Sequence, residues 1–140
     1  MDSTKSTALK ISFSLRLEKG YRSLGSDIHT NTNPYEAGLG FTVKLKKEEN
    51  FIGKEALMKL KESPLKKKLC CMVIDDSEGM ALGKEPIYDS HGKSVGYVTS
   101  TNYGYYVDKH IIYGYLPNDY SGEGTKLELD YFGKRYPITV

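Results

Sequence analysis

The chain has 140 residues, of which 39% are hydrophobic and 27% are charged, and its formal net charge is +2. This length favours one globular domain with a core of its own, and the composition excludes wholesale disorder and low-complexity architecture. No apolar run approaches the ~20 residues of a membrane-spanning helix, and the N-terminus lacks the pattern of a secretory signal. We therefore expect no membrane partner.

The N-terminal quarter of the chain has the weakest secondary-structure signal. Residues 1–13 are rich in Ser, Thr and Lys and are predicted to be a tail. Residues 15–25 place apolar side chains at no single period, so this segment is ambiguous between helix and strand, with a break at Gly20. After it, Asn33 and Pro34 predict a loop or a short helix that Pro34 opens.

Residues 51–63 are predicted to form a helix. Ile52, Ala56, Leu57 and Leu60 line one face at helical spacing, and most other positions hold strong helix formers. Pro64 forbids continuation, so the helix is expected to end just before it.

After residue 65 the pattern changes to short strands separated by turn residues. Alternating or β-rich runs occupy 68–75, 86–89, 94–100, 110–116, 125–131 and 135–140. Six short strands in so few residues are typical of a small closed, or nearly closed, antiparallel barrel, because closure removes exposed edges. The sequence therefore predicts a boundary near residue 65.

Cysteine, histidine and lysine patterns suggest no metal or nucleic-acid chemistry. Cys70 and Cys71 are adjacent, so they cannot form a disulfide that stabilises the fold. A reducing compartment is therefore expected, either the cytoplasm or, in a eukaryote, the mitochondrial matrix. The three histidines lie far apart in sequence. Residues 1–70 hold 14 basic and 8 acidic side chains, but no aromatic residues are interleaved for base stacking, so we expect no nucleic-acid partner.

A cluster of charged residues, Arg16, Glu18, Lys19 and Arg22, lies among apolar positions. An unpaired charge in a half-buried segment costs several kcal/mol, so these side chains must be paired or must face a polar ligand. One interpretation is a structural pair between Arg16 and Glu18 or Glu36. The other is a site for an anion or a heterocycle, because the guanidinium group offers a planar fork of donors.

Several motifs in a fixed order carry a resemblance to a known family. They are SLRLEKGYRSLGSDI at 14–28, TNPYEAGLGF at 32–41, FIGKEAL at 51–57 and the closing segment from residue 97 onward. Together they resemble the C-terminal part of the tetrahydrofolate-dependent aminomethyltransferase family. That family includes the glycine cleavage T-protein and the folate-binding halves of dimethylglycine and sarcosine dehydrogenases. The similarity runs from about residue 14 to residue 140.

The resemblance implies an α+β fold in which residues 14–64 are the last portion of a folate-binding domain and residues 65–140 are a six-stranded antiparallel β-barrel. It implies a fragment or subunit that helps tetrahydrofolate accept a one-carbon unit from a methylated amine or a glycine-derived intermediate. FAD is implied only where a separate dehydrogenase domain exists. The expected partner is the N-terminal half or a dehydrogenase domain, which carries the catalytic carboxylate, and homo-oligomerisation is a further expectation. The isolated chain is expected to be inactive.

Three residues become candidate folate contacts through the family motifs. Arg16 is the arginine of the SLRLE segment, Glu18 is expected to orient it, and Phe41 stands where the T-protein branch has a Trp. Leu24 departs from the motif, in which an aromatic residue is common. No catalytic residue and no metal ligand is assigned.

The alternative function is a non-enzymatic β-barrel that binds a protein partner. The chain contains 12 tyrosines, and tyrosine is enriched at protein interfaces. The competing interpretation of the same tyrosines is packing in the barrel core and on strand faces. Tyr103, Tyr105, Tyr106, Tyr113 and Tyr115 are the residues on which the two interpretations differ.

Overall fold

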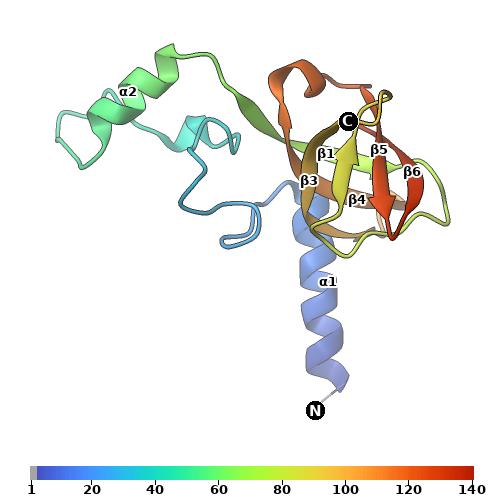
Figure 1. The fold of residues 1–140 in the computed structure, drawn as a ribbon. Helices are drawn as coiled ribbons and strands as arrows, with labels where there is room; N and C mark the ends of the chain where they lie inside the picture. Colours follow the sequence, from blue (N-terminus) through green and yellow to red (C-terminus); the bar gives the residue numbers. More distant parts are fainter. Residues whose placement is uncertain (1–2) are drawn as a thin grey trace.

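A computed structural model describes residues 3–140, with side chains from Ile11 onward, and it combines a β-barrel with two N-terminal helices. Figure 1 shows helix α1 (Ser3–Lys19) extending from one end of the barrel, with its N-terminal end pointing away. Helix α2 (Lys54–Glu62) lies at the far end of a segment that reaches away from the barrel. We call residues 29–66 the arm.

Helix α1 begins at Ser3, so the prediction of a tail over residues 1–13 is wrong from residue 3 onward, and residues 1–2 lie outside the described part. Ser and Thr have low helix propensity and argue against a helix in this segment, but it also contains Ala, Leu and Lys, which are strong helix formers. Because propagation is easier than nucleation, a helix that is anchored at its C-terminal end extends through such residues.

Gly20 ends helix α1 at the predicted break. Its φ of 83° is left-handed, a conformation that glycine adopts without steric cost. The Tyr21 N–H donates to the Arg16 carbonyl at 2.8 Å, and the Gly20 N–H donates to the Leu17 carbonyl at 3.1 Å. This Schellman arrangement satisfies two terminal carbonyls and turns the chain away from the helix axis.

The predicted strands form a closed antiparallel barrel, which confirms the expected fold class. The strands are β1 (Lys67–Ile74), β2 (Pro86–Tyr88), β3 (Ser94–Gly104), β4 (Lys109–Pro117), β5 (Lys126–Tyr131) and β6 (Lys134–Thr139). Their order around the barrel is β1-β4-β3-β2-β5-β6, and β6 pairs again with β1 through Val73 opposite Thr139 and Ile74 opposite Ile138. A short 3-10 helix, η2 (Asn118–Tyr120), follows β4.

The barrel has a core made from alternate residues of its strands. In β5, for example, Leu127 and Leu129 face inward, as period-two alternation requires. Six core side chains have no exposed surface: Ile87, Val98, Ile112, Leu116, Leu129 and Ile138. Full burial of a side chain of this size stabilises the fold by about 1.5–3 kcal/mol, so the barrel has a substantial source of stability within itself.

Helix α1 is attached to the barrel through its last turns. Leu17 is 2% exposed and packs with Ile111 and Tyr113 of β4. The Tyr113 hydroxyl donates to the Leu17 carbonyl at 2.7 Å, and the Ser14 hydroxyl donates to the Tyr103 carbonyl at 2.5 Å. Burial raises the pKa of Tyr113 to about 12, so its hydroxyl stays a neutral donor at neutral pH.

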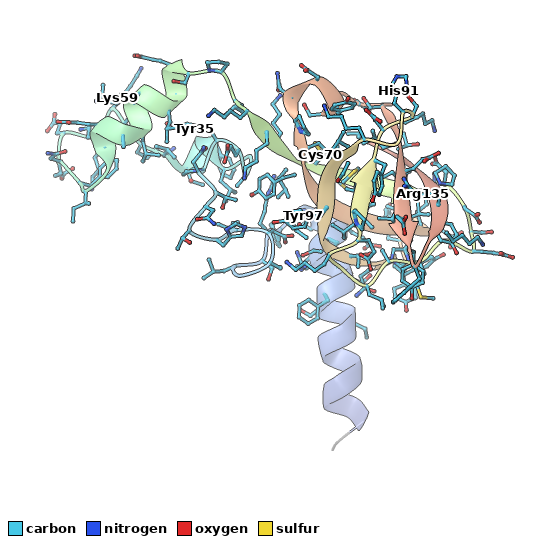
Figure 2. All side chains as sticks on the ribbon, viewed as in Figure 1. Tyr35, Lys59, Cys70, His91, Tyr97 and Arg135 are labelled. Carbon is cyan, nitrogen blue, oxygen red and sulfur yellow. The ribbon has the colours of Figure 1, made fainter. Side chains whose placement is uncertain are left out.

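The outer part of the arm makes few contacts with the rest of the molecule, although Ala37, nearer the barrel, is 1% exposed and its carbonyl accepts a hydrogen bond from Arg22 Nε at 3.0 Å. Helix α2 confirms the predicted helix, within slightly narrower bounds, but none of its residues is buried. The Tyr35 hydroxyl donates to the Leu57 carbonyl at 3.1 Å, and the Leu69 N–H of β1 donates to the Glu36 carbonyl at 2.8 Å. Figure 2 shows Tyr35 and Lys59 on the arm, well apart from Cys70 and Arg135 of the barrel. Between residues 3 and 140, neither helix has the length and apolarity to span a membrane.

Candidate functional site

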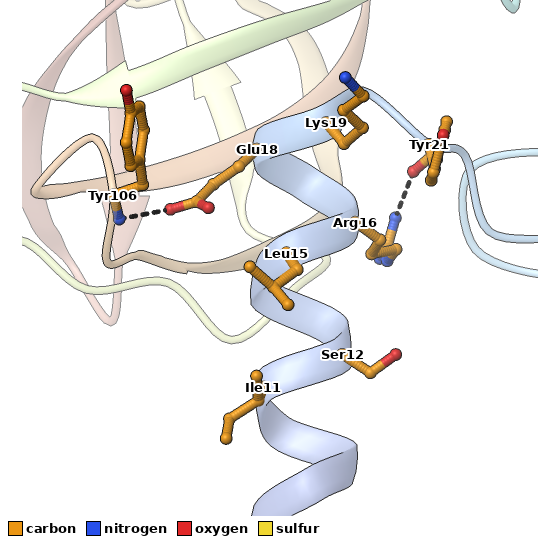
Figure 3. A pocket seen from close by; sticks show the side chains of 8 residues that line it. All are labelled: Ile11, Ser12, Leu15, Arg16, Glu18, Lys19, Tyr21 and Tyr106. Atoms are coloured by element: carbon orange, nitrogen blue, oxygen red, sulfur yellow. Dashed lines mark hydrogen bonds between the residues drawn. The ribbon is translucent and has the colours of Figure 1, made fainter.

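An open cavity of about 760 Å³ lies along helix α1, beside the turn that joins β3 to β4. It is lined by Ile11, Ser12, Leu15, Arg16, Glu18, Lys19, Tyr21 and Tyr106. Figure 3 shows Ile11, Leu15 and Glu18 on one side of the helix, toward Tyr106, and Ser12 and Arg16 on the other, toward Tyr21. The cavity therefore has two unlike sides, an apolar strip and a guanidinium side.

Arg16 is held in place by hydrogen bonds from both terminal nitrogens. Its Nη1 donates to Asp27 Oδ2 at 2.7 Å and to the Tyr21 carbonyl at 3.2 Å, while its Nη2 donates to Ser100 Oγ at 2.7 Å. The side chain is 17% exposed, and its buried Nε has no hydrogen-bond partner among the described residues. The guanidinium group is thus fixed in position while part of its donor capacity is unused.

Asp27 is the centre of this network and is completely buried. Besides Arg16, it accepts hydrogen bonds from Thr99 Oγ1 at 2.6 Å and from the Ser23 N–H at 2.9 Å. Burial by itself would raise the pKa of Asp27, but these hydrogen bonds outweigh it and hold the pKa below 3.8. The carboxylate therefore stays charged and ties helix α1, the following turn and strand β3 together.

The structure confirms that Arg16 has a structural partner, but the partner is Asp27 and not Glu18 or Glu36. Glu36 Oε2 instead accepts a hydrogen bond from the Asn33 N–H at 3.4 Å. Sequence reasoning missed Asp27 because its contact with β3 spans 72 residues. The available signal was its position in the motif SLRLEKGYRSLGSDI.

Glu18 occupies a different position from the one expected. Its Oε1 accepts a hydrogen bond from the Tyr106 backbone N–H at 2.8 Å, which fixes the β3–β4 turn against helix α1 (Figure 3). The expectation that Glu18 orients Arg16 therefore gives way to a different arrangement, in which Asp27 and Ser100 orient the guanidinium group. Glu18 and Arg16 still line the same cavity.

Phe41 lies on the short 3-10 helix η1 (Gly40–Thr42) of the arm and is 74% exposed. It is not among the residues that line the cavity at α1. The structure therefore brings Arg16 and Glu18 together but does not bring Phe41 to them.

The five tyrosines divide between the two interpretations. Tyr113 and Tyr115 are buried, and the Tyr115 hydroxyl donates to the Asp27 carbonyl at 2.8 Å, so packing explains both. Tyr105 and Tyr106, in contrast, are 75% and 91% exposed at the β3–β4 turn, and Tyr103 is partly exposed beside them. Of these five tyrosines, only Tyr103, Tyr105 and Tyr106 are therefore available for an interface.

Neither cysteine chemistry nor metal binding is indicated in the described part of the chain. Cys70 is buried and Cys71 is exposed, and both are free. Burial raises the pKa of the Cys70 thiol, which lowers its fraction of reactive thiolate. Among residues 3–140, no group of three or more His, Cys, Asp or Glu side chains could hold a metal ion.

Comparison with known proteins gives matches along nearly the whole chain. Curated relatives include mouse dimethylglycine dehydrogenase, mitochondrial, which is 41% identical over 126 residues that make up 90% of this chain and 14% of the mouse protein. An aminomethyltransferase of Prochlorococcus marinus (strain NATL1A) is 35% identical over 90% of this chain and 33% of its own length. The chain therefore spans one third or less of these relatives.

A solved structure and two family models agree with these relatives. The crystal structure of glycine cleavage system aminomethyltransferase T from Bartonella henselae superposes with a TM-score of 0.81 and 29% identity, over 91% of this chain and 36% of that one. The GCVT N-terminal domain model matches residues 4–47. The Glycine cleavage T-protein C-terminal barrel domain model matches residues 67–140. With more than half of its length matched by the barrel model alone, the chain belongs to the glycine cleavage T-protein family of aminomethyltransferases and related dehydrogenases.

Proposed function

We propose that this chain forms one wall of a tetrahydrofolate site and that it acts with the rest of an aminomethyltransferase or dehydrogenase in one-carbon transfer from a methylated amine or a glycine-derived intermediate. Family membership supports the folate and the reaction class. The single observation that carries the role of this chain is the position of Arg16, fixed at the edge of an open cavity.

The residues of the cavity fit a flat heterocycle with polar edges and carboxylates. Arg16 places a positive charge at the edge of the cavity, and the second hydrogen of Nη2 is not used by the bond to Ser100, so this donor matches a carboxylate or the edge of a pterin. Tyr21, which is 63% exposed, offers an aromatic face on the same side of α1. A ligand held there would complete the donor set of a group that is already positioned.

In this proposal the residues of the chain bind and orient, and they do not themselves react. Tetrahydrofolate supplies the nucleophilic nitrogen that accepts the one-carbon unit when it is bound. Asp27 and Ser100 keep the guanidinium group of Arg16 from reorganising as the ligand enters. We assign no flavin contact to these residues, because FAD would belong to a separate dehydrogenase domain.

Phe41 is a second, separate part of the proposal. Its ring is exposed on the arm, where an aromatic face can meet a ligand without rearrangement of the fold. Its support is this exposure together with its place in the family motif. For location, we propose the cytoplasm or, in a eukaryote, the mitochondrial matrix, and the dehydrogenase relatives that carry "mitochondrial" in their names support the second.

Calorimetric titration of tetrahydrofolate tests the proposal, with the chain alone and with a co-expressed polypeptide that carries a complete GCVT N-terminal domain. We expect binding in the presence of that polypeptide, and Arg16→Lys should weaken it about 10-fold or more, because an ammonium group cannot reproduce the bidentate fork. Phe41→Ala should weaken binding less, by about 2- to 10-fold, through the loss of one ring contact.

Arg135→Lys is the matched control, because Arg135 is an arginine of the barrel surface that pairs with Asp130 and Glu128, away from the cavity. It should leave the affinity unchanged. Thermal unfolding of each variant separates loss of binding from loss of fold. Absence of binding in the complete assembly, or equal effects of Arg16→Lys and Arg135→Lys, would overturn the assignment of Arg16 to a folate wall.

A further inference from the structure

The side of helix α1 opposite Arg16 carries an exposed apolar strip that folate binding does not use. Ile11 and Leu15, one helical turn apart, are 49% and 57% exposed. Tyr106 lines the same cavity from the β3–β4 turn, where Tyr105 and Val107 are also exposed, Val107 to 45%. Exposed apolar side chains on two elements that line one cavity indicate an interaction site. We call these five residues the α1–turn strip.

The α1–turn strip is held in one conformation before any partner binds. The Glu18 carboxylate accepts the Tyr106 N–H at 2.8 Å, and the Ser14 hydroxyl donates to the Tyr103 carbonyl at 2.5 Å, so the end of β3 and the turn itself are both joined to α1. Gly104 permits this close approach, since a Cβ there would lie 2.6 Å from Ile111 and 3.0 Å from Glu18. A preorganised surface loses little conformational entropy on binding.

We propose that the α1–turn strip is the docking surface for a polypeptide that carries the remaining part of the GCVT N-terminal domain. This inference rests on the proposed function and names the partner of the same site. Helix α1, from residue 4 onward, lies in the segment that the GCVT N-terminal domain model matches, residues 4–47, and the Prochlorococcus aminomethyltransferase is about three times as long as this chain. The neighbouring barrel has an enclosed core, but α1, from residue 11 onward, exposes three large apolar side chains, Ile11, Phe13 and Leu15.

The geometry separates the partner from the folate. Arg16, Ser12 and Tyr21 lie on one side of α1, and Ile11, Leu15 and Tyr106 of the α1–turn strip lie on the other (Figure 3). A polypeptide that covers Ile11, Leu15 and Tyr106 would therefore close the cavity from the side of the turn and leave the guanidinium side for the ligand. Docking would also exclude water from the Glu18 to Tyr106 hydrogen bond and strengthen it.

Site-specific photo-crosslinking tests this proposal in the cells that produce the protein, whether the partner sequence lies on the same or a different polypeptide. The photoreactive residue p-benzoylphenylalanine replaces Leu15, and the control position is Leu82, an exposed leucine of the barrel. Mass spectrometry of the products should identify sequence of a GCVT N-terminal domain linked to position 15 and not to position 82.

A pair of leucine variants gives an independent measure of docking, with the photoreactive probe moved to position 106. Leu15→Lys should lower the crosslinking yield from a probe at position 106 by about 10-fold or more, because a central apolar anchor is replaced by a charge. Leu82→Lys should leave that yield unchanged, and circular dichroism should show that both variants fold. Equal effects of the two variants would contradict the proposal.

Other products also decide the question. Crosslinks between two copies of this chain, crosslinks to a protein without a GCVT N-terminal domain, or no crosslink at position 15 would each overturn the proposed partner. The result of the folate titration is separate from the result of the crosslinking, so each proposal can fail without the other. Tetrahydrofolate binding that depends on Arg16 without docking at Leu15 would leave the proposed function standing, and docking without folate binding would leave only the interface.

Discussion

In the barrel, Ile87, Ile112 and Leu129 are fully enclosed, whereas helix α2 of the arm buries none of its residues. Around the barrel each strand pairs with two others, but the arm is joined to it mainly by isolated bonds such as Leu69 N–H to the Glu36 carbonyl. The two regions belong to one chain, yet their stability has different sources. The barrel is stabilised from within, and the arm depends on what it contacts.

Amide hydrogen exchange should show the largest difference between the two regions. We expect the Ile112 amide of β4 to exchange at least about 10⁴-fold more slowly than the Leu60 amide of α2, because the first opens only with the barrel and the second by local fraying. Measurement at residue resolution by NMR checks this. Similar protection at both amides would mean that the arm and the barrel unfold together.

Truncation of one leucine in each region should give a smaller difference, measured as the loss of unfolding free energy. Leu129→Ala removes a side chain with no exposed surface and should lower the free energy of unfolding by about 3–4 kcal/mol, from lost burial and the cavity left behind. Leu60→Ala, in the arm, should cost less than about 1 kcal/mol because that side chain is 39% exposed. Urea unfolding of the two variants is the measurement. A cost at Leu60 that equals the cost at Leu129 would contradict the comparison.

Asp27 lies at the boundary between the two regions, and Asp27→Asn tests how firmly α1 is attached to the barrel. Loss of the charge leaves Arg16 without its ion-pair partner and should cost about 2–3 kcal/mol of unfolding free energy. Glu128→Gln is the control, because the carboxylate of Glu128 is 48% exposed opposite Arg135 and a surface pair contributes about 0–1 kcal/mol. Similar losses in urea unfolding would show that the buried pair has no special role.

The smallest expected effect is the pH dependence of the same attachment. Because the folded pKa of Asp27 lies below 3.8, the unfolded chain takes up the proton more readily, and the stability that the carboxylate supplies is present above the unfolded pKa and is lost as the pH falls through the folded value. The advantage of the native protein over Asp27→Asn should therefore shrink as the pH is lowered from about 5 to about 2. Comparing the two proteins isolates Asp27 from Asp75 and Asp89, whose pKa values are also lowered. A constant difference across this range would contradict the assignment.

The barrel and helix α2 could be predicted from the sequence because their signals are local. Alternation at Leu127 and Leu129 indicates which side of a strand faces the core, and Pro64 limits helix α2. The closure of the barrel followed from the number of short strands, although the pairing of β1 with both β4 and β6 became visible only in the structure.

The candidate site could be predicted only in part. Arg16 was identified as a charge that needs a partner, and the structure places Asp27 and Ser100 around it. Ser100 is 84 residues away in sequence, and no local pattern encodes such a contact. The same reason explains Glu18, whose carboxylate reaches the distant Tyr106 backbone and not the neighbouring arginine. The start of helix α1 was missed because Ser and Thr at its beginning are also common in loops.

Ring closure between β1 and β6 also restricts how this molecule can join to others. An open sheet ends in a strand whose free N–H and C=O groups can recruit a strand from a neighbour, which is the route to fibrils and to runaway pairing of edges. A closed ring restricts that route, because no strand of the barrel has a fully unpaired edge. The chain can therefore present apolar side chains on α1 and α2 for assembly, and such sequence-specific surfaces are favoured over generic strand addition.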